Sequence, residues 1–304
     1  MRLSDYKKTF IFVTSALLVL LAVDRIGGMV MYRLLLKSQD TTSPKICYLV
    51  NGGCQSDMLL MGTSRCNVHF VPEILEDSLG MTVYNGGVDG SSNIFAHYFL
   101  LSSILTYHTP KVICLGVDVE DFTIQENEWE SVGFFAPFMG LTQAGDSIFR
   151  ESGQYHNYQL SHLYRYNAKS LEILSELTLG VQPEQEKGYM KRPKPPVVPE
   201  LVQEVPSVKP LDEVKVKYME RFAGKCREKG VELYFIVSPK LTVPGQEYVW
   251  LDAFCRKHQI PLLNYHQQGL FQDHPQYFWD ISHLWDEGAQ AFTRTVAHDL
   301  RQLR

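Results

Sequence analysis

The chain has 304 residues, of which 45% are hydrophobic and 21% charged, and its 29 basic and 34 acidic residues give a net charge of −5. A chain of this length and composition can bury its own hydrophobic core, which excludes disordered proteins, collagen-like proteins and disulfide-stapled miniproteins. The mild excess of acidic residues, with no run of five basic ones, gives no electrostatic footprint for a phosphate backbone. We therefore expect no nucleic-acid partner.

Basic residues and an apolar run open the chain. Lys7 and Lys8 precede the apolar segment 9–23, which ends at Asp24 and Arg25. The pattern predicts a membrane anchor or a signal sequence, with a buried N-terminal core helix as a third alternative. As a helix the run spans about 22 Å, short for a hydrocarbon core of about 30 Å, but snorkelling of Lys8 and Arg25 extends its reach. Since no small-residue cleavage site follows, we expect a single-pass anchor in the cell membrane and infer from it an extracytoplasmic body. The flanking charges roughly balance and do not fix the orientation themselves.

Beyond the anchor, short apolar runs alternate with helical patterns, as is typical of a parallel sheet covered by helices. We expect strands at 58–61, 82–84, 112–117, 233–237 and 261–263, and helices at 92–107, 211–229, 246–258 and 286–303. Asp286 is placed to cap the last helix and Gly230 to end the second. The predicted fold class is α/β, a flavodoxin-like three-layer sandwich with a central parallel sheet, preceded by an N-terminal transmembrane helix.

The alternation lapses between residues 119 and 210, and seven of the fifteen prolines fall at 183–210. We interpret 119–210 as an insertion in a domain that spans 37–304, after an anchor and juxtamembrane helix at 1–36. The insertion contains an aromatic-rich stretch, formed by Tyr155, His156, Tyr158, His162, Tyr164 and Tyr166. Ordinary packing is favoured for this stretch over a substrate groove.

The six cysteines lack the C-x-x-C spacing of a zinc site, and the sequence gives no metal site. Their even number is compatible with disulfides outside the cytoplasm. Cys47 and Cys54 flank the turn signal Asn51-Gly52-Gly53, which favours a bridge between them. Free buried thiols are at least as well supported.

Two short polar motifs are candidates for chemistry. The GTSR segment at 62–65 directly follows the first predicted strand, where a parallel sheet opens its ligand crevice, so Ser64 is either a nucleophile or a helix cap. Asp280 precedes His283 by three residues, a spacing at which a carboxylate can orient an imidazole toward a serine. Roughly half a match to that spacing is expected by chance, so spacing alone does not decide.

The LWDEGA segment that follows His283 extends the match, and the chain resembles the SGNH (GDSL-like) hydrolase superfamily. In that superfamily the nucleophilic serine follows the first strand, and an Asp-x-x-His pair precedes the last helix. The resemblance implies that Ser64 is the nucleophile, His283 the base and Asp280 the carboxylate that orients it. Gly87, in the NGGVDG segment after the second strand, matches the glycine whose backbone N–H forms the oxyanion hole with that of Ser64. A plain strand-to-helix turn is the alternative for Gly87.

The third family block departs from the pattern. The family places an asparagine after the third strand, where this chain has Asp118. An ionised carboxylate repels an oxyanion, so Asp118 serves there only if it is protonated, and otherwise has another role. A missing oxyanion donor costs about 10² to 10³ in rate, which puts ordinary esterase efficiency in doubt.

The anchor together with these motifs resembles membrane-attached SGNH-like proteins of cell-envelope modification, such as the alginate O-acetylation proteins and the D-alanyl transfer protein of teichoic acid synthesis. This resemblance implies a serine esterase or O-acyltransferase that acts on an acylated envelope glycan without a cofactor. The alternative is a catalytically weak module that binds a glycan or an envelope assembly partner. A flavodoxin-like cofactor domain is disfavoured, since no Gly-rich phosphate loop follows the first strand.

Overall fold

A parallel sheet of five strands forms the centre of the body. The computed structural model describes residues 3–37, 42–90, 93–126, 129–167, 185–203 and 207–304, together with Ser170 and Ile173. The sheet has the order β2-β1-β3-β6-β7, and its strands are β1 (Met58–Met61), β2 (Val83–Asn85), β3 (Val112–Gly116), β6 (Glu232–Val237) and β7 (Leu262–Asn264). The five predicted strands and their parallel pairing are confirmed, with bounds that differ by at most one residue. The flavodoxin-like three-layer class remains a prediction.

Helices connect the strands and pack on side chains that alternate along them. They are α2 (Thr42–Val50), α3 (Ser64–His69), α4 (Pro72–Leu79), α5 (Ile94–Ile104), α10 (Glu213–Glu228), α11 (Val249–His258), α12 (Tyr265–Gln268) and α13 (Asp286–Leu303). Leu59 and Phe235 belong to one buried cluster with residues of α5 and α10, whereas Met58 and Tyr234 belong to a second cluster with residues of α13. Since successive strand side chains point to opposite faces, the two clusters are the two sides of the sheet. All eleven residues of α5 are buried, so the rest of the chain covers this mostly apolar helix on every side.

The region 119–210 adds no strand to the central sheet among its described residues. It contains the helices α6 (Glu130–Gly133), α7 (Ser147–Glu151) and α8 (Tyr155–Leu160), the 3-10 turns η1 (Val119–Asp121), η2 (Ala136–Phe138) and η3 (Leu163–Tyr166), and the hairpin β4 (Gln185–Glu186) and β5 (Tyr189–Met190). Two members of the aromatic stretch, Tyr158 and Tyr166, are buried, and the ring of Tyr158 contacts those of Phe149 and Tyr164, whereas His156 and Tyr164 are exposed.

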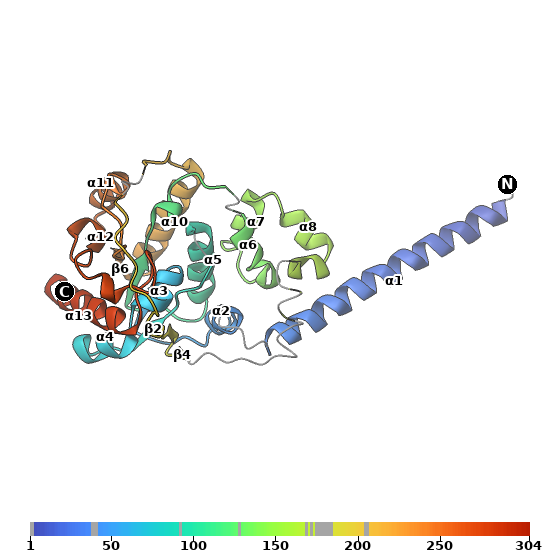
Figure 1. The fold of residues 1–304 in the computed structure, drawn as a ribbon. Coiled ribbons are helices and arrows are strands. Elements are labelled where there is room, and N and C mark those ends of the chain that lie inside the picture. Colours follow the sequence, from blue (N-terminus) through green and yellow to red (C-terminus); the bar gives the residue numbers. More distant parts are fainter. Residues whose placement is uncertain are drawn as a thin grey trace.

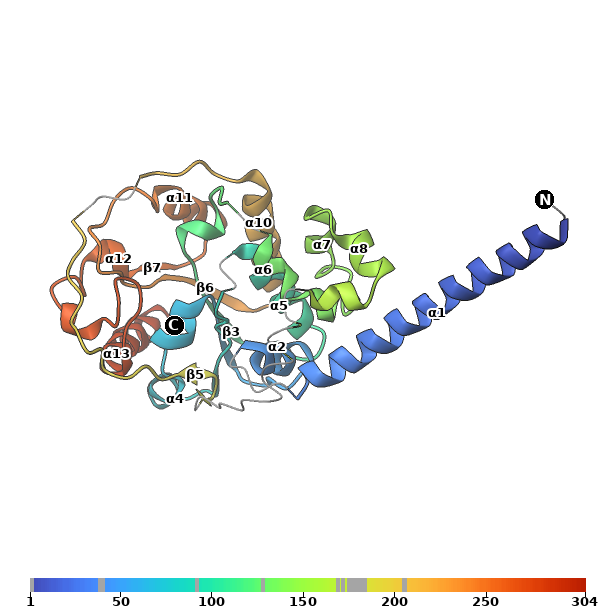
Figure 2. The ribbon, with the colours of Figure 1, turned by 45° about the vertical axis from the view of Figure 1, so that its right-hand side comes forward.

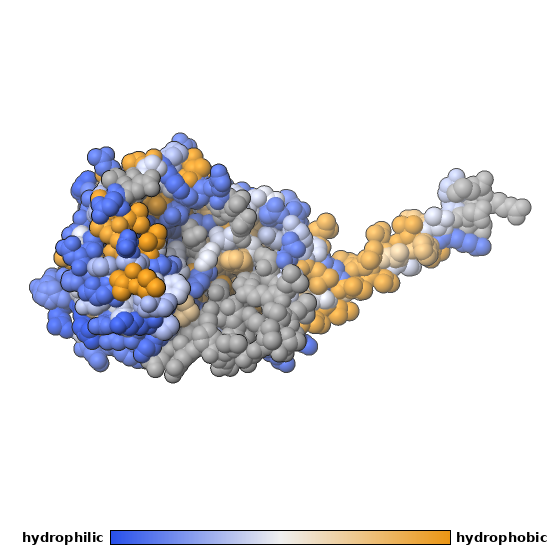
Figure 3. Space-filling view, viewed as in Figure 1, coloured by the Kyte–Doolittle hydropathy of each residue, from blue (hydrophilic) through white to orange (hydrophobic). Residues whose placement is uncertain are grey.

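Helix α1 (Leu3–Leu35) leaves the body as a single rod, and apolar side chains cover most of its length (Figures 1 and 3). It is long and apolar enough to cross a membrane, and its most apolar stretch is not buried by the rest of the chain. The buried core helix is therefore wrong as an interpretation of this segment. The same length and composition also occur in signal sequences. The turn η3, which follows α8, packs against the part of α1 that is nearest to the body (Figure 2).

The two predicted helix ends have different outcomes. Gly230, at φ +68°, follows α10, and the next N–H, that of Val231, donates to Cys226 O, so the glycine does end the helix. The prediction for Asp286 is wrong, because Trp285 is the N-cap residue of α13. The Asp286 carboxylate instead accepts hydrogen bonds from the Tyr189 hydroxyl and the Gln290 amide.

All six cysteines are free and buried. Cys47 and Cys54 are thus free thiols, although a turn separates them. Burial raises the pKa of the Cys47 thiol to about 11 and that of Cys66 to about 12. Buried thiols with such pKa values are poor nucleophiles at neutral pH.

The N-cap of α10 gives a test of the fold. Asp212 accepts hydrogen bonds from the N–H groups of Val214 and Lys215 at 2.8 and 3.1 Å. We expect Asp212→Ala to lower the free energy of unfolding by about 1 kcal/mol, since two N–H groups lose their acceptor. Lys217→Ala, on the exposed side of the same helix, should change it by less than about 0.5 kcal/mol. Chemical denaturation of the detergent-solubilised chain measures both, and equal effects would contradict the capping role.

Candidate functional site

Ser64 begins α3 directly after β1. The turn between them needs glycine, because Gly62 has φ +153° and a Cβ there would lie 2.7 Å from Cys66 Cβ. Thr63 is the N-cap residue of the helix, so the Ser64 hydroxyl is not used as a cap. The tight turn therefore presents the serine at the carboxyl end of the strand.

Three predicted site residues lie in hydrogen-bond contact. Ser64 Oγ is 2.8 Å from His283 Nε2, and His283 Nδ1 is 2.8 Å from Asp280 Oδ2. Asp280 Oδ1 accepts from the N–H groups of Ser282 and His283 at 2.7 and 2.9 Å, which fixes the carboxylate in the turn. The fold joins side chains 219 positions apart in the geometry of a Ser-His-Asp triad.

A buried histidine supports the turn that carries His283. His69, at the end of α3, accepts the N–H of Leu284 through Nε2 at 3.0 Å. The N–H of Trp279 donates to His283 O at 2.7 Å and closes the turn. The base is therefore held by contacts from both α3 and its own loop.

The surroundings tune both titrating members of the triad. Burial lowers the pKa of His283, Arg192 and Arg65 lower it further, and Asp280 opposes the shift without reversing it. Burial raises the pKa of the Asp280 carboxyl, but the N–H groups of Ser282 and His283 together with the imidazole outweigh this and leave it below its ordinary value. At neutral pH the pair is thus a neutral imidazole beside a carboxylate.

Gly87 packs against α3 instead of facing open space. Its N–H donates to Asn85 Oδ1 at 3.0 Å, and a Cβ at this position would lie 2.4 Å from the backbone nitrogen of Asn67. Close approach to the helix explains the glycine. To donate to an oxyanion, the Gly87 N–H would have to leave Asn85, so its catalytic role remains a prediction.

A buried lysine that the sequence analysis did not single out holds this region together. Lys45 of α2 donates through Nζ to Asn67 Oδ1, Gly87 O and Gly188 O at 2.5, 2.8 and 2.6 Å. Burial lowers its pKa to about 8. Nothing in the local sequence marks this residue, because its acceptors come from three distant segments.

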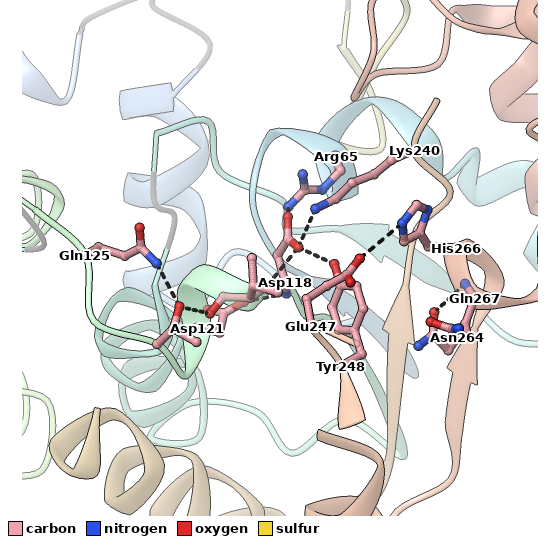
Figure 4. A network of polar contacts seen from close by, with 12 residues as sticks. Arg65, Asp118, Asp121, Gln125, Lys240, Glu247, Tyr248, Asn264, His266 and Gln267 are labelled. Carbon is pink, nitrogen blue, oxygen red and sulfur yellow. Dashed lines mark hydrogen bonds and ion pairs between the residues drawn. The ribbon is translucent and has the colours of Figure 1, made fainter. Parts of the chain in front are cut away.

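Asp118 lies in a buried polar network at the carboxyl ends of neighbouring strands (Figure 4). Its carboxylate forms ion pairs with Arg65 and Lys240, the latter at 2.7 Å, and accepts the hydroxyl of Tyr248. Its own N–H donates to Asp121 Oδ2 at 2.8 Å, which holds the backbone at the end of β3. Asp118 therefore takes the other role that the sequence analysis allowed, as the counterion of two cations.

The network continues away from the triad. Glu247 lies 3.3 Å from His266 Nε2, and both side chains are buried (Figure 4). Burial lowers the pKa of the Lys240 ammonium to about 7, and Arg65 adds to the effect. The signal that could have found Lys240 is its place three residues after β6, at the same edge of the sheet as Ser64.

Arg192 is another cation that the sequence analysis missed, and its charge acts on His283 of the triad. It follows β5, and its guanidinium lies over the ring of Trp279, 4.6 Å from the centroid. Its buried Nε makes no hydrogen bond within the described part of the chain. The insertion thus contributes a positive charge beside the loop that carries Asp280.

No cluster of three metal-ligating side chains is present within the described ranges. The polar groups that converge at this edge are the triad and the Asp118 network. The chemistry that the arrangement supports is transfer of a proton from a serine hydroxyl to an imidazole.

Asparagine at position 118 gives a test of the network. We expect Asp118→Asn to lower the free energy of unfolding by about 3–5 kcal/mol, because Arg65 and Lys240 would lose their buried counterion. Asp252→Asn removes an exposed ion pair with Arg256 and should cost less than about 1 kcal/mol. Denaturation of both variants measures the difference. A fully stable Asp118→Asn chain would show that the network does not depend on the charge.

Comparisons with known proteins do not assign a family or a function to this chain. No protein-family model matches the chain, and no curated protein matches it significantly.

Proposed function

We propose that the protein is a membrane-anchored serine esterase or O-acyltransferase that acts on an acylated cell-envelope glycan. The observation that carries the proposal is the 2.8 Å contact from Ser64 Oγ to His283 Nε2, with Asp280 at 2.8 Å on the other ring nitrogen. The resemblance to SGNH hydrolases supports the same residues in the same roles. We further propose the flavodoxin-like three-layer class and an extracytoplasmic body for the domain that follows α1.

Each triad member has a defined part in the reaction. His283 Nε2 accepts the proton of the Ser64 hydroxyl while Oγ attacks the acyl carbonyl. The Nδ1–H donates to Asp280, which fixes the tautomer and stabilises the imidazolium. The imidazolium then protonates the departing alcohol, leaving an acyl group on Ser64. Water or a sugar hydroxyl, deprotonated by the same imidazole, releases it, which gives hydrolysis or transfer respectively.

The N–H of Ser64 is placed to receive the oxyanion, because the first N–H groups of a helix have no acceptor within it. The N–H of Gly87 would be the second donor once it leaves Asn85. Arg65, whose charge acts on His283, adds positive potential on the side of Asp118. In this proposal a paired cation supplies part of the stabilisation that an asparagine gives in the family.

The insertion contributes a cation to the surroundings of the triad. Residue Arg192 follows β5 and lies over Trp279, next to Asp280. A cation at this position favours substrates that carry negative charge near the ester. In this proposal the insertion thereby contributes to the choice of substrate.

The second candidate function is a catalytically weak module that binds a glycan or an assembly partner. Two observations favour it: Asp118 replaces the family asparagine, and the Gly87 N–H is engaged by Asn85. A site without two free oxyanion donors loses about 10² to 10³ in rate for each one missing. The triad geometry favours the enzyme.

Labelling with a fluorophosphonate probe distinguishes the two functions. We expect the full chain in detergent to be labelled, because an activated serine attacks phosphorus as it attacks an acyl carbon. Ser64→Ala should abolish labelling and His283→Ala should reduce it at least about 10²-fold. The full chain is needed, since the end of α1 packs on the insertion. Ser282→Ala, in the same loop with an unaltered triad, is the matched control, and a folded wild type without label would favour the binding module.

The pH dependence of labelling tests the charges around His283. The rate should fall as the imidazole is protonated, with a midpoint below 6.5, because burial and the two arginines lower its pKa. Arg192→Gln should raise that midpoint toward 6.5, since one of the cations that oppose protonation is gone. The control is Lys191→Gln, because the Lys191 ammonium pairs with Asp286, and this variant should leave the midpoint unchanged. A midpoint that does not move in Arg192→Gln would remove that residue from the electrostatics of the site.

A further inference from the structure

Helix α1 as a whole is long enough to cross a bilayer, but its uninterrupted apolar run covers only part of the hydrocarbon core. Residues 9–23 give about 22 Å, whereas a hydrocarbon core is about 30 Å thick. The missing ~8 Å corresponds to about five more helical residues, which places the boundary near Gly28. The outer face of α1 remains apolar over this stretch, where Ile26, Met29 and Val30 are about half exposed.

A boundary near Gly28 places the charged residues Asp24 and Arg25 inside the membrane, where the insertion provides partners for them. The Asp24 carboxylate accepts hydrogen bonds from the Ser161 hydroxyl and from the N–H groups of His162 and Leu163, and it pairs with Arg25 at 2.6 Å. Backbone and side-chain donors from the insertion thus satisfy a carboxylate on the anchor. Such pairing is what a charged residue at this depth requires.

Close packing brings the insertion to the level of the boundary. A Cβ at Gly28 would lie 2.5 Å from His162 Cβ, so the glycine allows η3 to lie directly against α1. At this junction Leu160, Leu163 and Tyr164 are 77%, 40% and 41% exposed. These apolar side chains are continuous with the exposed face of α1, and a lipid surface is the partner that fits a patch joined to a membrane-spanning helix.

A cavity of about 500 Å³ opens at the same junction. Its walls include Met29, Tyr32 and Phe138, and two arginines, Arg33 and Arg165, also line it. Arg33 is exposed, and within the described part of the chain no carboxylate pairs with it. Five residues beyond Gly28, Arg33 would lie about 7 Å outside the hydrocarbon, within the headgroup layer.

We propose that this junction binds an anionic phospholipid, with the headgroup phosphate in the cavity on Arg33 and Arg165 and the acyl chains along α1 and the exposed side chains of η3. Apolar walls combined with two cations match the two parts of such a lipid. The site is independent of the serine chemistry, and the lipid reaches it without leaving the bilayer.

Fluorescence quenching in nanodiscs tests the proposal on the full chain. Bimane is attached to Leu160→Cys, or to Val249→Cys on α11 as a control far from α1, while the six native thiols are buried. The discs contain phosphatidylcholine and phosphatidylglycerol, with brominated chains on one lipid or the other. We expect quenching at position 160 and none at 249, with brominated phosphatidylglycerol favoured about fivefold for each arginine.

Charge variants identify the headgroup site. Arg33→Gln should reduce the preference for phosphatidylglycerol, and Arg33→Gln with Arg165→Gln should abolish it while quenching at 160 persists. Lys37→Gln, one turn further along and outside the cavity lining, should leave the preference intact. No quenching at 160 would overturn the membrane contact. The headgroup site would be overturned if both brominated lipids quench equally when Arg33 and Arg165 are present. It would also be overturned if Lys37→Gln loses as much of the preference for phosphatidylglycerol as Arg33→Gln.

Discussion

The carboxylate of Asp118 ties together the ends of three neighbouring strands. It follows β3, pairs with Arg65 after β1 and Lys240 after β6, and accepts the Tyr248 hydroxyl before α11. Because these groups are buried, each charge needs the others. Arg65 is the residue after Ser64, so the same pairing fixes the first turn of the helix that begins with the serine. Asp118 is thus the centre of the electrostatic support for this edge of the sheet.

The cations near the triad have two opposed effects. Arg65 and Arg192 lower the pKa of His283, which keeps the imidazole neutral at lower pH and makes it a weaker base. The same charges favour the anion that forms when a serine attacks a carbonyl. Asp280 offsets part of the loss of basicity through its contact with Nδ1. The two arginines therefore favour an oxyanion but disfavour the imidazolium that forms with it.

Sequence patterns predicted the elements and the triad better than the groups around them. The strand at 58–61 and the helix at 286–303 were predicted with their observed bounds, because a short apolar run and helical periodicity are local signals. The position of Ser64 at the edge of the sheet followed from the rule that functional side chains lie after parallel strands, whereas its pairing with His283 was implied by the resemblance to SGNH hydrolases. Lys45 could not be predicted, since its acceptors depend on tertiary packing. Asp286 was misassigned because Tyr189 and Gln290 compete for its carboxylate.

Burial of all six thiols protects them from oxidants in the folded chain. Cys47 and Cys66, like the other four, are enclosed and protonated at neutral pH, so neither disulfide formation nor alkylation proceeds until the surrounding structure opens. In an oxidising compartment the order of events then matters: the core has to close before an oxidant reaches it. A chain that folds too slowly would be trapped by cross-links that its native state never forms, and its lifetime would be limited by folding speed as much as by equilibrium stability.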